Sequence, residues 1–458
     1  MTGPLTVARA GPRSSVARHG ARLQRRLRPP PRRVARYAWP AAVAAVFGAR
    51  YASESLRHRR EDGEGYELKC DQLDVGDHAF MRAAEALTGA PISAGNTVEL
   101  HVNGDAIFPA FTEAIESARR TITLTTYVFW KGEIAKEIAG LLCSRARAGV
   151  HVSVLLDFVG SVKMDRSVVR EMREAGVEVA LFRPPRPYAL SRMNNRTHRK
   201  LLVIDGERGM IGGVGIADEW TGNGEDPDHW RDTHVTVRGP AVRGLQGAFA
   251  ENWLEATGCA LVGPEHLPDL QPVADGGPMQ VVRSSAGVGD TNVEALYFLA
   301  IACARQTLDL TAAYFAPRPA FIDALEKAAE RGTRIRVLVP GANIDKPFVR
   351  MAGREAYSRL LDAGVCLYEY TPTMLHAKTM VVDGVWSTVG SVNFDNRSFQ
   401  LQDEATLCVQ SADFAGELTR QFEEDLANAN AIEPGRWRGR PLHHRLQEQA
   451  LSLVRREI

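Results

Sequence analysis

The chain has 458 residues, of which 45% are hydrophobic and 24% charged, a balance typical of a globular protein with two or three domains. Its formal net charge of +1 hides an asymmetry, because residues 1–60 carry 14 arginines, no lysine and one acid, Glu54. That segment is +13 and the remainder is −12. An acidic body argues against a nucleic-acid enzyme, whose groove would be basic.

The first segment, residues 1–65, is predicted to be a basic arm. Its longest uncharged apolar run, residues 37–49, contains Pro40 and is shorter than the roughly 20 residues of a membrane-spanning helix. A signal peptide, an organellar transit segment and a solvated tail are alternatives. We expect the arm to be flexible or to lie on an anionic membrane surface.

After a predicted helical lead-in at residues 66–95, the chain repeats itself. Each copy has an apolar-periodic helix that runs into a β-rich strand, at 110–129 and 295–315. Each copy later has a strand, an Asp-Gly turn and a second strand ending in glycines, at 197–216 and 375–394. The repeat predicts an α/β fold of two similar lobes, each a mixed β-sheet flanked by helices, related by a pseudo-twofold.

The predicted lobes span residues 96–260 and 278–430, joined by a Pro/Gly-rich connector. Residues 431–458 form a basic C-terminal tail or helix. A membrane-facing helix and a packed helix remain equal alternatives there. The amphipathic positions of the tail are Leu446, Ala450, Leu453 and Val454.

Each copy carries one His-x-Lys-x4-Asp motif, and composition predicts only about 0.01 accidental matches per chain. The motif residues are His198, Lys200 and Asp205 in the first copy and His376, Lys378 and Asp383 in the second. On a strand, positions i and i+2 share a face, so each His and Lys project together. A neutral imidazole can attack phosphorus while an ammonium offsets the phosphoryl charge. Two facing lobes would supply a nucleophile and a general acid, with each Asp tying its turn together.

These motifs resemble the phospholipase D superfamily, and the stretches RTHRKLLVIDG and HWRDTHVTVRGP are most similar to bacterial cardiolipin synthases. The resemblance implies an active site between the two lobes that works without metal or cofactor. It implies that His198 forms a phosphohistidine, and that His376 protonates the leaving alcohol and then deprotonates the incoming one. Lys200 and Lys378 would hold the phosphoryl oxygens.

The same resemblance places one acid downstream of each motif to orient the catalytic imidazole. Asp232 follows His198 by 34 residues, and Glu404 follows His376 by 28. A carboxylate there fixes the tautomer of the ring and raises its basicity. His229, Asp232 and His234 could suggest a metal site, but no further spaced ligand set supports one, and no metal is predicted.

A phosphate-contacting segment is implied after the second motif, at Gly390, Ser391 and Asn393. Glycine permits close backbone approach, and serine and asparagine donate hydrogen bonds. The first copy departs from this pattern, because residues 212–215 read Gly-Gly-Val-Gly. A symmetric amide contact from the first lobe is therefore in doubt.

The predicted function is phosphatidyl transfer by a cardiolipin synthase of phospholipid biosynthesis, which converts two phosphatidylglycerol molecules into cardiolipin and glycerol. The expected partner is an anionic phospholipid membrane containing phosphatidylglycerol and cardiolipin, with no nucleic acid. The expected location is peripheral, on the cytoplasmic face of the bacterial inner membrane. Alternatives are a hydrolytic phospholipase D, a nuclease or other phosphodiesterase, and a catalytically silent lipid-binding scaffold. The usual amino-terminal spanning helices of the cardiolipin synthase branch are not evident.

Overall fold

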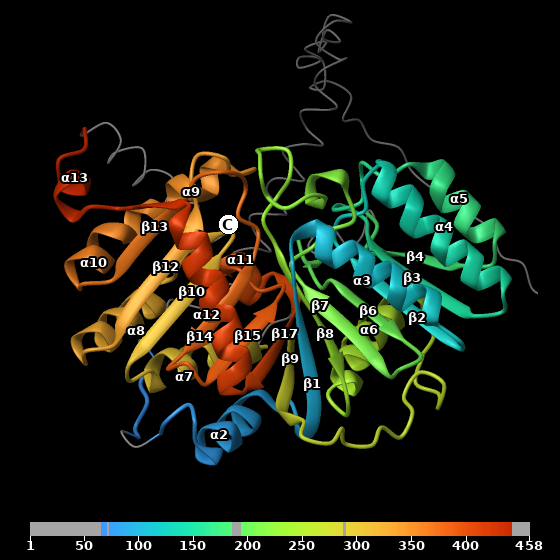
Figure 1. The fold of residues 1–458 in the computed structure, drawn as a ribbon, viewed down its shortest axis with the longest axis horizontal. Helices are drawn as coiled ribbons and strands as arrows, with labels where there is room; N and C mark the ends of the chain where they lie inside the picture. Colours follow the sequence, from blue (N-terminus) through green and yellow to red (C-terminus); the bar gives the residue numbers. More distant parts are fainter. Residues whose placement is uncertain (1–65, 71–72, 186–193, 287–289, 442–458) are drawn as a thin grey trace, which may run out of the picture. The chain divides into compact units, whose positions relative to one another are not determined.

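The computed structural model describes residues 66–70, 73–185, 194–286 and 290–441. The predicted basic arm and the four amphipathic tail positions lie outside these residues. The described chain forms two α/β halves whose strands join into one 16-stranded sheet (Figure 1). The predicted fold class of two similar mixed lobes is confirmed.

The first lobe has seven strands in the order β1-β8-β7-β6-β2-β3-β4. Its strands are β1 (Ile92–Val102), β2 (Thr121–Thr126), β3 (His151–Asp157), β4 (Glu178–Phe182), β6 (Leu201–Ile204), β7 (Arg208–Gly212) and β8 (Thr233–Arg238), with the short β5 (Arg196–Thr197) paired to the second lobe. Its helices are α3 (Asn103–Ser117), α4 (Glu133–Arg147), α5 (Arg166–Glu174) and α6 (Val242–Thr257), and the 3₁₀ helix η2 is Asp218–Trp220.

The second lobe repeats this order as β9-β17-β15-β14-β10-β12-β13, with β18 at the edge. Its strands are β9 (Gly277–Ser284), β10 (Thr307–Ala312), β12 (Arg334–Pro340), β13 (Cys366–Tyr370), β14 (Lys378–Val382), β15 (Trp386–Gly390), β17 (Gln402–Gln410) and β18 (Ala429–Ala431), and β11 (Phe315–Ala316) pairs separately with β16 (Phe394–Asp395). Its helices are α7 (Asn292–Cys303), α8 (Pro319–Glu330), α9 (Pro347–Gly353), α10 (Tyr357–Asp362), α11 (Asn396–Gln400), α12 (Ala412–Ala427) and α13 (Pro434–Arg438), with the 3₁₀ helix η3 at Arg354–Ala356.

The apolar strands of each lobe are covered on both faces, which explains their continuous hydrophobic runs. In β3, Val154 and Leu156 pack into the core beneath α3, α4 and α5, whereas Leu155 packs against Phe249 of α6. In β12, Val337 packs into the α7–α8 core and Leu338 against α12. Helices therefore cover both sides of each half-sheet, as the alternation of helices and strands predicts.

The two half-sheets are joined by hydrogen bonds between β1 and β9, which lie side by side in the middle of Figure 1. Their antiparallel pairing is interrupted by a register shift between Ser93 and Asn96. One core cluster also contains strand residues of both lobes, including Leu201, Val237 and Leu407. The lobes thus share backbone pairing and apolar packing.

The lead-in contributes helix α2 (His78–Thr88), but this helix packs on the second lobe rather than on the first, which follows it in sequence. The ring of Phe80 meets that of Trp386 edge to face, with centroids 5.5 Å apart. Strand β1 begins at Ile92, within the segment predicted as helical lead-in. Among the described residues, no helix combines the length and the apolar character needed to cross a bilayer.

Candidate active site

The two motif histidines lie on opposite lobes and line one pocket of about 230 Å³, together with Lys200. His198 lies between β5 and β6, and His376 lies two residues before the start of β14. Each histidine backbone is fixed by the other lobe: the His198 N–H donates to Asp403 O at 2.8 Å, and the His376 N–H to Arg231 O at 2.7 Å. The structure therefore brings the two motifs together at the junction of the lobes.

The side chain of His198 is held entirely by acceptors from the second lobe. Its Nδ1 lies 3.0 Å from Glu404 Oε1 and 3.1 Å from the carbonyl oxygen of Ser391. A carbonyl can only accept, so this geometry favours a proton on Nδ1. The unprotonated Nε2 is then the nitrogen that can attack phosphorus.

His376 is held in the same way by an acid of the first lobe. Its Nδ1 lies 2.7 Å from Asp232 Oδ2, and the indole Nε1–H of Trp220 donates to the same oxygen at 2.8 Å. Lys378 Nζ is 2.8 Å from the same Nδ1. Nδ1 of His376 cannot donate to Asp232 and accept from Lys378 at the same time. If Nδ1 carried no proton, its lone pair would face the Asp232 carboxylate and be repelled by it. We therefore place the Nδ1 proton toward Asp232.

The sequence placed one orienting acid after each motif, and the structure pairs these acids across the lobes. Asp232 of the first lobe serves His376, and Glu404 of the second lobe serves His198. The backbone hydrogen bonds explain this crossed pairing. The carbonyl of Arg231 binds the His376 N–H, and Asp232 is the next residue. The carbonyl of Asp403 binds the His198 N–H, and Glu404 is the next residue. Neither lobe alone contains a histidine with its acid.

Burial and nearby lysines keep both imidazoles neutral at physiological pH. Desolvation, with added repulsion from Lys200 and Lys378, lowers the pKa of His198 well below its usual value. Desolvation, followed by repulsion from Lys378, lowers the pKa of His376 to about 3. Desolvation likewise lowers the pKa of Lys200 to about 7 and that of Lys378 to about 8. A neutral imidazole is the form that attacks phosphorus.

The two acids differ in charge state. Burial raises the pKa of Glu404 to about 7, despite the opposing effect of Lys200. Burial also acts to raise the pKa of Asp232, but its interactions with His376 and Lys378 outweigh it and lower this pKa overall. Asp232 is thus ionised at neutral pH and can stabilise an imidazolium on His376, as a general acid requires.

These pKa shifts predict the pH dependence of kcat/KM. The nucleophile His198 must be neutral and its pKa is lowered well below its usual value, so the acid limb should lie below the usual titration range of histidine. The lysines lose their positive charge as pH rises through about 7 for Lys200 and about 8 for Lys378, so kcat/KM should fall above pH 8. Initial rates of phosphodiester cleavage at constant ionic strength measure the profile. A rise in kcat/KM between pH 8 and 9.5 would contradict the assignment.

The motif lysines lie beside the histidines that precede them. Lys200 Nζ donates to His198 O at 2.8 Å, and Lys378 Nζ donates to His376 O. Both side chains are almost fully buried. Tyr127 packs edge to face against His198, with ring centroids 5.3 Å apart, and closes that side of the site.

Asp205 and Asp383 do not line the pocket but tie each Asp-Gly turn to the start of a neighbouring strand. Asp205 accepts backbone N–H groups of Arg119, Arg120 and Thr121 at 2.7–2.9 Å. Asp383 does the same for residues 305–307 at 2.7–2.9 Å. Both aspartates have positive φ, 54° and 52°, which aspartate tolerates better than most residues. They fit the turn-stabilising role expected of them.

The residues of the predicted phosphate-contacting segment lie behind His198, beside Glu404. The hydroxyl of Ser391 donates to Glu404 and accepts from Ala405 N–H at 3.1 Å, so it orients the acid. Asn393 is buried, and its Oδ1 has no hydrogen-bond partner in the described part of the chain. Gly390 lets β15 approach β17, because a Cβ there would lie 2.4 Å from Ala405 O. Ser391 therefore orients the acid behind His198, and the contact of this segment with phosphate stays a prediction.

The glycines of the first lobe have a steric explanation. A Cβ on Gly213 would lie 2.1 Å from Asp232 Oδ1, so glycine admits this carboxylate. A Cβ on Gly215 would lie 2.8 Å from Val128 and 3.1 Å from the Trp220 ring. The space of the expected amide is thus occupied by Trp220, whose ring packs edge to face on His376 at 5.1 Å.

Two buried arginines that sequence reasoning missed hold the lobes in register. Arg199, between the motif His and Lys, donates to Glu404 O and Ser284 O of the second lobe. Arg231, which precedes Asp232, forms a bidentate pair with Asp425 of α12 at 2.8 and 2.9 Å. Each arginine is the sequence neighbour of a site residue, and that position was the available signal.

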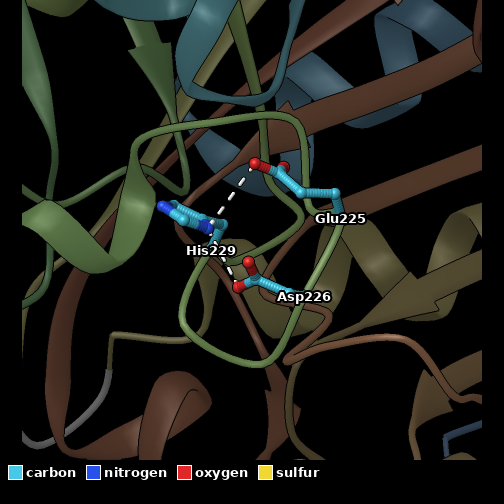
Figure 2. Close-up of side chains that lie close together, drawn as sticks. All are labelled: Glu225, Asp226 and His229. Atoms are coloured by element: carbon cyan, nitrogen blue, oxygen red, sulfur yellow. Dashed lines mark hydrogen bonds and ion pairs between the residues drawn. The ribbon is translucent and has the colours of Figure 1, made fainter.

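His229, Asp232 and His234 are possible metal ligands in the sequence, which nevertheless predicts no metal site there. In the structure these three side chains have different surroundings. Asp232 binds His376, and both ring nitrogens of buried His234 have no partner among the described residues. His229 instead meets Glu225 and Asp226, with Nδ1 3.5 and 2.9 Å from their carboxylates (Figure 2). These exposed acids also accept backbone N–H groups of their own loop, so the cluster orders the loop that carries Trp230 to the pocket.

Comparison with known proteins gives consistent matches over both lobes. A family model described as "Cardiolipin synthase, PLD-like domain" matches residues 111–226 and 297–426. The cardiolipin synthase of Geobacillus sp. (strain WCH70) is 35% identical over 422 residues, covering 89% of this chain and 84% of that protein. The cardiolipin synthase of Geobacillus thermodenitrificans (strain NG80-2) is 36% identical with the same coverage.

A solved structure supports the fold independently. The crystal structure of phosphatidylserine synthase from Haemophilus influenzae Rd KW20 superposes with a TM-score of 0.61, covering 83% of this chain and 100% of that one. The sequences are only 13% identical, so this likeness concerns the fold alone.

Proposed function

The chain belongs to the cardiolipin synthase family of phospholipase D-like enzymes, and we propose that it transfers a phosphatidyl group from one phosphatidylglycerol to another, releasing glycerol. The family makes it a phosphatidyltransferase that acts on phospholipids. The observation that supports the mechanism is the pocket in which two neutral histidines face one site, each held by an acid of the opposite lobe.

In the first step, Nε2 of His198 attacks the phosphorus of the donor lipid, and the bond to the glycerol oxygen breaks. The leaving oxygen takes a proton from His376, whose imidazolium is stabilised by Asp232. His376 is neutral in the free enzyme, and it takes up this proton from solvent when the negative phosphodiester binds, because that anion favours the imidazolium. Lys200 and Lys378 offset charge on the phosphoryl oxygens during transfer.

In the second step, a hydroxyl oxygen of the acceptor lipid attacks the phosphohistidine. The phosphorus–nitrogen bond breaks, and the hydroxyl proton passes to His376. His198 returns to its neutral form, and cardiolipin is released. Atoms and charge balance without any redox partner.

Product analysis tests the proposal. Purified protein is incubated with phosphatidylglycerol vesicles in the presence of a chelator, and lipids and glycerol are quantified. We expect cardiolipin and glycerol in equal amounts. Phosphatidic acid without cardiolipin would identify a hydrolase, and no lipid product would turn the search to other phosphodiesters.

We further propose that the enzyme acts as a peripheral protein on the cytoplasmic face of the bacterial inner membrane. Exposed apolar side chains lie at the pocket: Val159 and Val162 line it and are 40% and 73% exposed. Phe348 is 50% exposed and lies two residues after the pocket residue Lys346. We call Val159, Val162 and Phe348 the apolar rim, and it fits a lipid surface from which substrate enters.

The apolar rim predicts a loss of membrane binding. The double substitution Val162→Asp with Phe348→Asp should weaken binding to phosphatidylglycerol vesicles by roughly 10- to 100-fold. Both side chains are already partly buried, so their further burial in lipid contributes about 1.5–3 kcal/mol for the two together. Vesicle co-sedimentation measures this. Leu87→Asp is the matched control, because Leu87 is 53% exposed on α2, at the other end of the second lobe in Figure 1 from α9. Equal binding by the wild type, the double variant and Leu87→Asp would contradict a role of the apolar rim in membrane binding.

A further inference from the structure

Two lysines outside the motifs line the same pocket, one from each lobe. Lys163 follows β3, and Lys346 follows β12, the corresponding strand of the second lobe. Each ammonium lies over an aromatic ring of the lining: Lys163 Nζ is 4.0 Å from the Trp130 centroid, and Lys346 Nζ is 4.5 Å from that of Tyr314. Three of the eight lysines of the chain thus line this pocket, and the buried Lys378 contacts His376 behind it.

Lys346 is the member of this pair whose charge reaches the reacting groups. After desolvation and the motif lysines themselves, its positive charge contributes to the lowered pKa of His198. It also contributes, after larger effects, to the lowered pKa of both Lys200 and Lys378. Lys346 is only partly exposed, whereas Lys163 is exposed. Lys346 therefore stands between the motif residues and the pocket mouth.

The ammonium of Lys346 is available to a ligand. The neighbouring carboxylate, Asp345, accepts the hydroxyl of Tyr314 at 2.7 and 2.9 Å. Within the described ranges, Lys346 Nζ forms no ion pair. Its ammonium lies over the Tyr314 ring, which in turn packs edge to face near His376, with centroids 6.4 Å apart. The carboxylates of Asp345 and Asp395 favour the charged form of Lys346 from a distance, but among the described residues neither forms an ion pair with it.

We propose that Lys346 binds the phosphodiester of the acceptor lipid, the one that is not transferred. This inference rests on the proposed function, because only transfer between two phosphatidylglycerol molecules brings two phosphodiesters to the site together. The motif lysines serve the phosphoryl group on His198. The acceptor phosphodiester stays intact and lies one glycerol bridge away from the attacking hydroxyl. A cation there offsets repulsion between the two anions and favours an anionic lipid acceptor over water or a neutral alcohol.

The test is a competition between acceptors. Wild type and variants act on phosphatidylglycerol vesicles in buffer containing ethanol, and the ratio of cardiolipin to phosphatidylethanol is measured. In Lys346→Gln this ratio should fall at least about tenfold, since a charge-assisted hydrogen bond is lost for one acceptor only. Lys346→Arg should restore the ratio to within about threefold of wild type, because it keeps the charge. Lys327→Gln, an exposed lysine on α8, is the control and should match wild type.

The possible results distinguish a failure of the proposed role of Lys346 from a failure of the proposed function. A wild-type enzyme that makes cardiolipin, with an unchanged ratio in Lys346→Gln, would overturn the role of Lys346 alone. Parallel loss of both products would also overturn it, because Lys346 would then serve the donor phosphate or the fold. A wild-type enzyme that makes phosphatidylethanol but no cardiolipin would refute both the acceptor and its subsite. A reduced ratio in Lys346→Gln that arginine restores would support the proposal.

Discussion

His376→Ala is expected to leave the enzyme able to form a phosphatidyl adduct from an activated donor, whereas His198→Ala should form none. Both substitutions should reduce cardiolipin formation by at least about 10⁴-fold, because a double displacement needs nucleophile and acid together. The roles separate when the leaving group needs no proton. A phosphatidyl donor with nitrophenol in place of glycerol provides that condition.

With this donor, His376→Ala should release about one equivalent of nitrophenolate per enzyme and then stop. Mass spectrometry under alkaline conditions, in which phosphohistidine persists, should find the lipid on His198. His78→Ala, an exposed histidine at the start of α2, is the control and should turn over like wild type. An adduct on His376 in the His198→Ala protein would reverse the assigned roles.

Asp232→Asn is expected to lower kcat by roughly 10²- to 10⁴-fold, and by more than Glu404→Gln does. The amide cannot stabilise an imidazolium on His376, and its N–H₂ can bind Nδ1 and impose the wrong tautomer. Glu404 is a different case, because burial already raises its pKa to about 7 and the Ser391 carbonyl also holds the Nδ1 proton of His198. Rates on phosphatidylglycerol vesicles give the comparison.

Asp228→Asn is the matched control for Asp232→Asn. Asp228 is exposed in the loop that precedes Asp232, and its substitution should leave the rate within about twofold of wild type, as for most surface changes. A larger loss from Glu404→Gln than from Asp232→Asn would show that orientation of His198, rather than the charge state of His376, limits the reaction.

The sequence was most informative where chemistry is local. The motif spacing identified His198 and His376, the repeat predicted the two lobes, and the positions after each motif indicated Asp232 and Glu404. The first two inferences depend on strand periodicity and on the internal repeat, and the third depends on the resemblance to the phospholipase D superfamily.

The crossed pairing of acids and histidines could not be obtained in this way. It depends on which main-chain carbonyl of one lobe meets a histidine of the other, and no periodicity within a lobe records that contact. The same holds for Trp220, which occupies the space of an expected amide because Gly215 has no side chain. It also holds for Arg231, whose partner Asp425 is 194 residues away.

The β1–β9 pairing determines how the catalytic groups are preorganised. Opening the lobes like the two halves of a hinged enzyme would break interstrand hydrogen bonds and the apolar core that both lobes share. The relative placement of the two imidazoles is therefore achieved once, during folding, and is not acquired by induced fit at each turnover. Thermal inactivation of this enzyme should accordingly coincide with cooperative loss of its secondary structure, because no partly open form retains an intact histidine pair.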